Sequence, residues 1–218
     1  QMKNIILIGG GGNALVILST IIDINKKKKI YNVVGFLDDN KKTKLKKIKY
    51  LGVLSKKNVD LLLKKEDIFF VWTLISTNLR KQEIRKLLQL KIPLKNFTSF
   101  AHPTAIVSEM ASIGKGVTIH PLVNIGPNVK IGNHVHIFAQ AMIGHDTKLG
   151  DYCYVANNAS IGAKVHAKEG VYFGANSSVI EKLKIFSWSI IGLGSVLLKN
   201  VNSKKIMVGN PARELIKN

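Results

Sequence analysis

A histidine followed directly by an aspartate, His145-Asp146, is the pair of side chains in this chain best suited to moving a proton. An imidazole changes its charge near neutral pH, and an adjacent carboxylate can hold it in one tautomer and favour its protonated form. The pair falls between the inward-facing positions of a repetitive segment. We therefore expect it on a turn, where the ring of His145 has space and few competing partners.

A run of four glycines, Gly9 to Gly12, could bring backbone N–H groups close to a phosphate. The run follows an apolar segment, and a helical pattern begins at Asn13, so a phosphate could lie at the N-terminus of that helix. Asp38 and Asp39 end the next apolar segment, where carboxylates of nucleotide-binding folds accept hydrogen bonds from ribose. An alternative is a purely structural turn formed by Asp39 and Asn40.

The element that would carry His145 is a run of seventeen hexapeptides from Ala101 to Asn202, without an insertion or a deletion. An apolar residue leads each hexapeptide, aliphatic or small except at Phe173, and four positions later stands a second residue, usually small or β-branched. This period fits short strands that each point an aliphatic side chain inward, and it predicts a β-solenoid. The glycine that follows many lead residues is expected to relieve the turn.

The first 100 residues alternate predicted strands and helices. Apolar runs predict strands over residues 3–8, 33–37 and 68–75, and helical patterns predict helices over residues 13–25, 55–65 and 78–90. This order favours a Rossmann-like parallel sheet. We expect a Rossmann-like domain over residues 2–100, a β-helical domain over residues 101–202 and a C-terminal cap over residues 203–218.

The composition limits the possible partners. The formal net charge is +20, from 33 Lys and Arg against 13 Asp and Glu, yet only three of the basic residues are arginines. Because base-edge recognition favours arginine, we expect no nucleic-acid partner, and we expect the lysines to attract anionic substrates. No apolar run reaches 18 residues, which predicts a cytoplasmic protein without membrane insertion. The single cysteine, Cys153, falls at an inward position, which argues against a disulfide or a catalytic thiol.

Five short motifs lie along the chain in an order that can be compared with known families. The chain contains Ile-Gly-Gly-Gly-Gly-Asn-Ala at 8–14, Gly-Phe-Leu-Asp-Asp at 35–39, His-Pro-Thr-Ala at 102–105, Gly-His-Asp at 144–146 and Val-Gly-Asn-Pro-Ala-Arg at 208–213. In this order they resemble bacterial sugar acyltransferases, which include sialic acid O-acetyltransferases and nucleotide-sugar N-acetyltransferases of the bacillosamine type. The resemblance implies an α/β plus all-β chain, with a left-handed parallel β-helix of three hexapeptides per coil. Residues 18 apart should then stack, so that Thr118, His136 and Tyr154 form one ladder.

The resemblance also implies an enzyme, an acetyl-CoA-dependent N-acetyltransferase of a nucleotide-linked amino sugar. The sugar would be a 4-amino-4,6-dideoxy sugar for a surface glycan such as lipopolysaccharide O-antigen. The family's catalytic base matches His145, oriented by Asp146, in a homotrimer with sites between subunits and no metal. The positions that match acetyl-CoA contacts are Tyr154, Gly174, Ala175, Gly192, Leu193 and Gly194. Those that match sugar-nucleotide contacts are Gly11, Gly12, Asn13, Asp38 and Asp39.

Two positions depart from the family pattern. Tyr154 stands where the bacillosamine enzyme has a second histidine, and its hydroxyl can still donate a hydrogen bond to the thioester carbonyl. Asn13 replaces a histidine common after the glycine turn. Among the remaining histidines, His102 is expected to be structural, and His136, beside Tyr154, is the second candidate for contact with the acetyl donor. Solvated or inter-subunit positions are expected for His120, His134, His136 and His166.

Other functions stay open on the sequence. An O-acetyltransferase of sialic acid or of another sugar is the nearest alternative, because only the acceptor group differs. A zinc-dependent carbonic anhydrase also uses a trimeric left-handed β-helix, but this chain lacks a His-x4-His pair. A nucleic-acid-binding solenoid has only the net charge in its favour.

Overall fold

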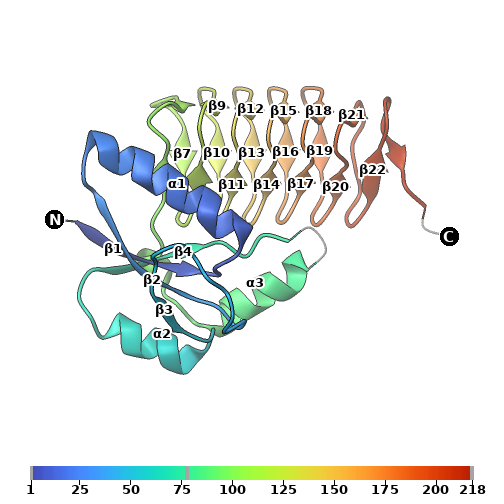
Figure 1. Cartoon of the computed structure of the whole chain (residues 1–218). Helices are drawn as coiled ribbons and strands as arrows, with labels where there is room; N and C mark the ends of the chain where they lie inside the picture. The colour runs from blue at the N-terminus through green and yellow to red at the C-terminus, as the bar shows by residue number, and fades with distance from the viewer. Residues whose placement is uncertain (1, 77–78, 217–218) are drawn as a thin grey trace. The chain divides into compact units, whose positions relative to one another are not determined.

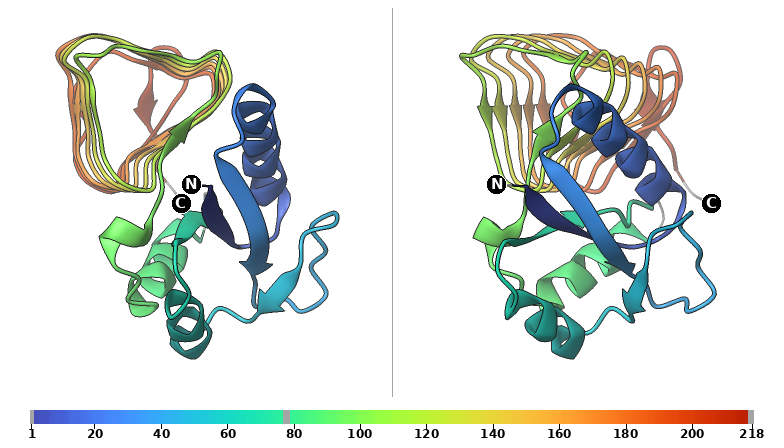
Figure 2. Two further views of the ribbon diagram at one scale, coloured as in Figure 1. Left: turned by 90° about the vertical axis from the view of Figure 1, so that its left-hand side faces the viewer. Right: turned by 60° about the vertical axis from the view of Figure 1, so that its left-hand side comes forward.

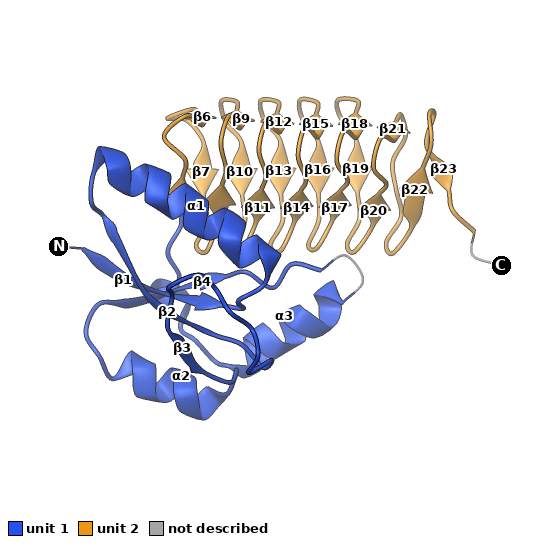
Figure 3. Ribbon diagram, viewed as in Figure 1, with its two compact units in different colours: residues 1–99 blue, residues 100–218 orange. Residues whose placement is uncertain are grey.

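The computed structural model describes residues 2–76 and 79–216. The chain forms two compact units, Gln1–Ser99 and Phe100–Asn218, which are coloured separately in Figure 3. Figure 1 labels their helices and strands. The first unit carries the glycine run, and the second carries His145.

The first unit is built on a four-stranded parallel sheet with the strand order β3-β2-β1-β4. Its elements are β1 (Lys3–Ile8), α1 (Gly12–Lys27), β2 (Tyr31–Leu37), β3 (Tyr50–Gly52), α2 (Lys56–Leu63), β4 (Ile68–Trp72), α3 (Arg80–Gln89) and the short 3-10 helix η1 (Leu94–Asn96). Four consecutive residues of β1, from Ile5 to Ile8, are fully buried. Burial on both faces is typical of a parallel strand in an α/β sheet. The Rossmann-like prediction is therefore confirmed.

Several predicted bounds of the first unit shift. The strand expected over residues 68–75 ends at Trp72, and β3 was not predicted because three residues are too few to show a period. The helix predicted over residues 55–65 spans Lys56–Leu63. It begins at Lys56 because the Ser55 hydroxyl caps it by accepting a hydrogen bond from the Asn58 N–H at 3.2 Å. The start predicted for the last helix, at Asn78, lies outside the described residues.

The second unit is a left-handed parallel β-helix whose three sheets form a triangular prism, seen end-on in the left view of Figure 2. One sheet has five strands: β7 (Ser112–Ile113), β10 (Lys130–Ile131), β13 (Lys148–Leu149), β16 (His166–Ala167) and β19 (Lys184–Ile185). A second has six: β6 (Ile106–Val107), β9 (Asn124–Ile125), β12 (Met142–Ile143), β15 (Ser160–Ile161), β18 (Ser178–Val179) and β21 (Val196–Leu197). The third has eight: β5 (Phe100–Ala101), β8 (Thr118–Ile119), β11 (His136–Ile137), β14 (Tyr154–Val155), β17 (Tyr172–Phe173), β20 (Ile190–Ile191), β22 (Ile206–Val208) and β23 (Arg213–Glu214).

The hexapeptide pattern places the strands correctly. From β5 to β21 every strand is two residues long, and its second residue is the predicted lead residue of a hexapeptide. Lead residues such as Ile137 and second small residues such as Val135 are fully buried in one continuous core. His136 pairs with Thr118 on one side and with Tyr154 on the other, so the predicted ladder of residues 18 apart is confirmed.

The glycine that follows many lead residues was expected to relieve the turn, and this reason is wrong. Left-handed backbone occurs two positions later, at residues such as Asp146 (φ 59°) and Asn128 (φ 58°), and is mostly adopted by non-glycine residues. At Gly144 an added Cβ would lie 2.6 Å from the Ala163 nitrogen of the next coil. These glycines therefore allow adjacent coils to approach closely, because no side chain fits between their backbones.

The last coil ends in an antiparallel pair, in which Met207 and Val208 of β22 face Glu214 and Arg213 of β23. No helix in the described part of the chain combines the length and the apolar character needed to cross a bilayer.

Candidate active site

His145 and Asp146 lie on the turn between β12 and β13, at the corner where the six-stranded sheet meets the five-stranded sheet. The Nδ1 atom of His145 lies 2.7 Å from Oδ2 of Asp146, and both side chains are exposed, at 53% and 41%. Because Nδ1 faces the carboxylate, Nε2 is the ring nitrogen left to exchange a proton with a ligand. The two residues thus form an acid–base pair open to solvent.

The neighbouring coils hold this turn from both sides. The Asp146 N–H donates to the Pro127 carbonyl at 3.0 Å, and the Lys164 N–H donates to the His145 carbonyl at 2.9 Å. The Asn128 amide donates to Oδ1 of Asp146 at 3.2 Å. The hydrogen bonds from His145 and Asn128 hold the pKa of the Asp146 carboxyl below its ordinary value. Asp146 therefore remains ionised and can stabilise a protonated His145.

Sequence reasoning did not single out Asn128, although it contacts the candidate site. It lies 18 residues before Asp146, which is one coil of the solenoid. Applying the coil period to the neighbours of the His-Asp pair would have found it.

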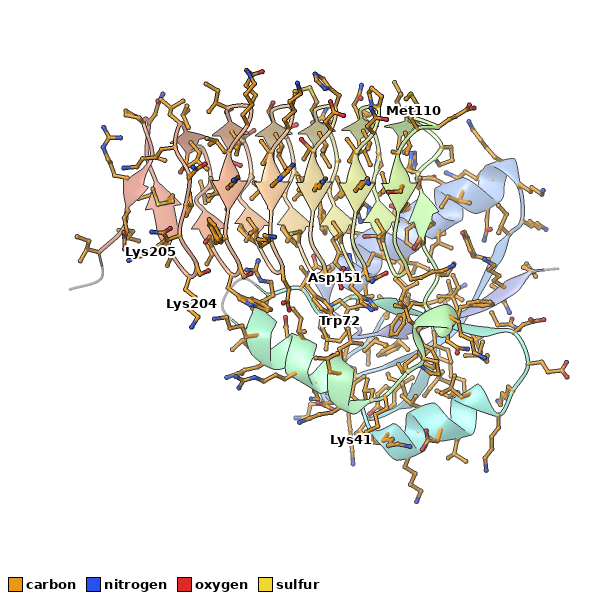
Figure 4. All side chains as sticks on the ribbon, turned by 180° about the vertical axis from the view of Figure 1, so that it is seen from behind. Lys41, Trp72, Met110, Asp151, Lys204 and Lys205 are labelled. Carbon is orange, nitrogen blue, oxygen red and sulfur yellow. The ribbon has the colours of Figure 1, made fainter. Side chains whose placement is uncertain are left out.

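A basin of about 810 Å³ lies beside the turn on the outer surface of the second unit. It is lined by Met110, Ser112, Asn128, Lys130, Asp146, Lys148, Lys164, His166, Lys182 and Lys184. Figure 4 labels Met110 on the edge of the solenoid that carries this turn, and it labels Asp151 on the opposite edge of the five-stranded sheet. The lysines give this basin a positive potential suited to anionic ligands.

Tyr154, expected to contact acetyl-CoA, lies half-buried in the eight-stranded sheet. Its ring stacks on Tyr172 at a centroid distance of 4.8 Å and packs against Phe138 at 4.9 Å. Burial, together with Tyr172, raises the pKa of its hydroxyl. The phenol therefore stays protonated and can donate a hydrogen bond.

The remaining candidate donor contacts lie at the corner between the eight-stranded and six-stranded sheets. Leu193 is 81% exposed, and a Cβ added to Gly194 would meet nothing within 4 Å. A Cβ on Gly174 would lie 2.5 Å from the Leu193 nitrogen, and one on Gly192 would lie 2.8 Å from Val208. Coil packing therefore explains Gly174 and Gly192, whereas Gly194 and the neighbouring Ala175 leave the surface open to a ligand.

Within one chain these groups are not brought together. The His145 turn and the corner that carries Ala175 and Leu193 are different corners of the prism, with the six-stranded sheet between them. Tyr154 belongs to the eight-stranded sheet, which takes no part in the His145 corner. A single solenoid thus presents the base on one edge and the candidate donor contacts on another.

The four glycines of the first unit form two pairs with different structural roles. Gly9 has φ +107°, and a Cβ on Gly10 would lie 2.6 Å from the Phe36 ring, so both are required by the fold. Gly11 is the N-cap of α1 with φ −78°, Gly12 is its first residue, and a Cβ on either would meet nothing within 4 Å. The chain itself therefore does not need glycine at 11 and 12. Open space at a helix N-terminus is what an approaching phosphate requires.

The other residues predicted to contact the sugar nucleotide already form hydrogen bonds or ion pairs within the first unit. The Asn13 amide donates to the Ile75 carbonyl at 3.1 Å. The Asp38 carboxylate accepts from the Gly10 N–H at 2.7 Å. Asp39 accepts from the Leu54 N–H at 3.0 Å and pairs with Lys86. Through these bonds the two aspartates brace the glycine turn and its surroundings, and their contact with a sugar nucleotide stays a prediction.

Three of the four histidines expected at solvated or inter-subunit positions are buried, so the solvated alternative is wrong for them, whereas the burial of His102 agrees with a structural role. His120, His134 and His136 are no more than 6% exposed, and His102 is 9% exposed. The Nδ1 atom of His136 lies 2.8 Å from the Thr118 hydroxyl. Burial lowers the pKa of His120 to about 4 and that of His136 to about 3. The rings of His120 and His136 are therefore neutral parts of the packed structure.

Within residues 2–76 and 79–216, no group of three or more His, Cys, Asp or Glu side chains is arranged to hold a metal ion. Cys153 is fully buried, and its thiol donates to the Lys168 carbonyl at 3.2 Å. The thiol is thus not placed to meet a substrate.

Both units match known family models. Residues 4–87 match the PglD N-terminal domain, and residues 130–163 match the bacterial transferase hexapeptide repeat. The predicted family resemblance is confirmed. A comparison with curated proteins finds no match.

Solved structures share the whole architecture. A mutant of perosamine N-acetyltransferase from Caulobacter crescentus, in complex with CoA and GDP-perosamine, is 21% identical with a TM-score of 0.86, covering 100% of this chain and 99% of that chain. The acetyltransferase domain of PglB from Neisseria gonorrhoeae is 20% identical with a TM-score of 0.81, covering 98% of this chain and 100% of that chain. WeeI from Acinetobacter baumannii is 22% identical with a TM-score of 0.80, covering 99% and 100%. The likeness establishes a parallel-sheet unit followed by a left-handed β-helix.

Proposed function

We propose that the protein is an acetyl-CoA-dependent N-acetyltransferase that acts on a nucleotide-linked amino sugar, of the 4-amino-4,6-dideoxy class. The observation that carries the proposal is the exposed pair formed by His145 Nδ1 and Asp146 Oδ2 at 2.7 Å. The fold supports it, since the similar structure from Caulobacter crescentus holds CoA and GDP-perosamine. A hexapeptide-repeat unit and a PglD-type N-terminal unit in one chain fit the same chemistry.

His145 is the general base of the proposed reaction. The sugar amine attacks the thioester carbonyl of acetyl-CoA, so that a C–N bond forms and the C–S bond breaks. His145 Nε2 takes the proton that the amine loses and returns it to the departing thiolate of CoA. Asp146 holds Nδ1 and stabilises the imidazolium while it carries the proton. The Tyr154 hydroxyl of a neighbouring subunit would donate a hydrogen bond to the carbonyl oxygen as negative charge develops on it.

The first unit would hold the acceptor. Gly11 and Gly12 leave space at the N-terminus of α1, where backbone N–H groups and the helix dipole favour the diphosphate of a nucleotide sugar. Asp38 contributes indirectly by holding the Gly10 N–H.

A homotrimer would complete the site. The base and the candidate donor contacts lie on different corners of one prism. Rotation about a three-fold axis can bring one corner of a subunit against another corner of its neighbour. In this arrangement His145 of one subunit meets acetyl-CoA bound along Leu193 and Gly194 of the next. We place the enzyme in the cytoplasm, in the synthesis of a surface glycan such as O-antigen, because both co-substrates are made there.

The test is an acceptor screen. The enzyme is incubated with acetyl-CoA and with GDP-, UDP- or dTDP-linked 4-amino sugars, and thiol release and the mass of the product are followed. We expect one amino sugar to gain an acetyl group and His145→Ala to lower kcat by roughly 10²- to 10⁴-fold. Thiol release with sialic acid or another hydroxyl acceptor, and with none of the amines, would assign O-acetyl transfer instead. Turnover by His145→Ala close to that of the wild type would exclude His145 as the base.

A further inference from the structure

The loop between β2 and β3, in the first unit, carries more lysines than any other loop of the chain (Figure 1). Residues 40–49 contain six lysines and no acidic residue. All six are exposed: Lys41, Lys42, Lys44, Lys46, Lys47 and Lys49. None of them forms an ion pair with another residue that the structure describes. The positive charge of this loop is therefore presented to solvent.

Buried contacts hold the loop in one shape. Leu45 is 1% exposed and forms an isolated antiparallel bridge with Ile48, whose N–H donates to the Leu45 carbonyl at 2.9 Å. The Thr43 N–H donates to the Asn40 carbonyl at 2.9 Å. The Thr43 methyl group packs over Gly10, 2.7 Å from the place that a Cβ there would take. Because the backbone is held in this way, little ordering entropy is lost when the lysines meet a partner.

One of the lysines occupies a position that does not suit its backbone. Lys46 lies in the turn between Leu45 and Ile48 and has φ 45°, in the left-handed region. Glycine and asparagine adopt this conformation at lower cost than lysine. The stability of the turn therefore does not require lysine at this position, and its charge is what the residue contributes.

The composition of the loop selects the kind of anionic partner. Recognition of base edges favours arginine, and binding to single-stranded nucleic acid uses stacked aromatic rings. The loop contains neither. The nearest aromatic residue, Tyr50, donates its hydroxyl to the Asp38 carbonyl at 3.0 Å and packs on Phe36. A cluster of exposed lysines without these groups fits the diffuse negative charge of anionic lipid headgroups.

We propose that the β2–β3 loop binds the surface of an anionic membrane, with its lysines at the phosphates of the lipid headgroups and no part of the chain inserted. Each lysine that reaches the surface strengthens the binding by about fivefold. A single polybasic patch gives reversible binding, and salt screens it. Such binding is independent of the acetyl transfer proposed above, which needs no membrane.

The experiment is sedimentation of the full-length protein with vesicles. One set contains phosphatidylglycerol and phosphatidylcholine, and the other contains phosphatidylcholine alone. We expect binding to the first set only, and we expect its loss in about 1 M NaCl, where the Debye length falls to about 3 Å. Duplex DNA, GDP and UDP are titrated in parallel by calorimetry.

Two triple variants distinguish the loop from the net charge of the protein. Replacing Lys41, Lys44 and Lys47 together by glutamine should weaken the binding to phosphatidylglycerol vesicles by roughly 100-fold. The control replaces three exposed lysines in and after α2 by glutamine and removes the same charge from the same unit. These lysines are Lys57, Lys64 and Lys65. The control variant should bind the vesicles nearly as the wild type does.

A single variant guards against a folding defect. Lys46→Asn suits the left-handed backbone, so its melting temperature should not fall, while its binding to the vesicles should weaken by about fivefold. A loss of binding that accompanies a stable fold assigns the effect to the charge.

Four results would overturn the proposal. The first is equal binding to the two sets of vesicles, and the second is an equal loss in the two triple variants. The third is tighter binding to duplex DNA than to the phosphatidylglycerol vesicles at the same salt concentration, which would assign the loop to nucleic acid. The fourth is a loop variant that loses GDP or UDP binding but keeps vesicle binding, which would assign the lysines to the acceptor site. None of these measurements needs turnover, so they can fail or succeed separately from the proposed reaction.

Discussion

Replacing Gly12 by alanine should stabilise the first unit and weaken its binding of the acceptor. Gly12 is the first residue of α1, and a Cβ there meets nothing within 4 Å. Alanine restricts the unfolded chain and favours the helix, so the free energy of unfolding should rise by about 0.4 to 1 kcal/mol. For a unit of this size the melting temperature should rise by roughly 2 to 8 °C.

The same methyl group would occupy the space in which a diphosphate approaches the backbone. Losing one hydrogen bond to a charged group costs about 1.5 to 3 kcal/mol, so the acceptor should bind roughly 10- to 100-fold more weakly. A gain in stability together with a loss of affinity would show that Gly12 leaves room for a ligand. It would also show that glycine is not there only for its backbone conformation. Thermal unfolding of the free protein and calorimetric titration with the nucleotide sugar measure the two quantities.

Gly10→Ala is the matched control. Its Cβ would lie 2.6 Å from the Phe36 ring, so this variant should lose stability. If Gly12→Ala bound the acceptor with unchanged affinity, the open space at α1 would not be a phosphate site. If Gly12→Ala melted below the wild type, the reasoning about helix entry would be refuted.

Three further predictions concern the second unit. Asp146→Asn keeps the shape of the side chain but removes its charge, so kcat should fall by roughly 10- to 10²-fold while the fold persists. Steady-state kinetics measure kcat, and circular dichroism checks the fold. An unchanged kcat would contradict the role of Asp146. Gly144→Ala should destabilise the solenoid by about 1 to 3 kcal/mol, because its Cβ meets the Ala163 backbone at 2.6 Å; denaturant unfolding measures this, and wild-type stability would refute the packing argument. Burial lowers the pKa of His120 from its ordinary value of 6.5 to about 4, so the ring is neutral in the folded protein. The unfolded chain therefore binds protons that the folded chain does not as pH falls from about 6.5 towards 4, and stability should drop by about 2 kcal/mol at pH 5 from this ring alone. Equal stabilities at pH 7 and pH 5 would show that the ring is not held neutral.

The sequence was most informative where its period equals a structural period. Because one hexapeptide makes one strand and its turn, the sequence assigns lead residues such as Ile137 to strands and to the interior. The coil period also predicted the stacking of Thr118, His136 and Tyr154. The alternating pattern of the first unit predicted its parallel sheet, but not β3, which is only three residues long.

The candidate site was predictable only in part. That His145 and Asp146 lie on a turn follows from the hexapeptide register, because both fall between inward positions. Their mutual hydrogen bond forms only in the folded turn, and the support from Asn128 comes from another coil. Such contacts join residues 18 apart, and a reading of adjacent residues does not reveal them.

By itself, the sequence determined the repeat, the inward positions and the two candidate chemistries, proton transfer at His145 and phosphate binding at the glycine run. These properties are local or periodic, so the order of residue types is enough to specify them. Only the tertiary structure decided which glycines serve packing and which leave open space, and that His120 and His136 are buried. It also showed that Asp38 and Asp39 are already engaged, and it placed the base and the donor contacts on different corners. The physical reason is that burial, close approach and hydrogen bonding depend on what lies on the neighbouring coil or strand, and those neighbours are remote in the chain.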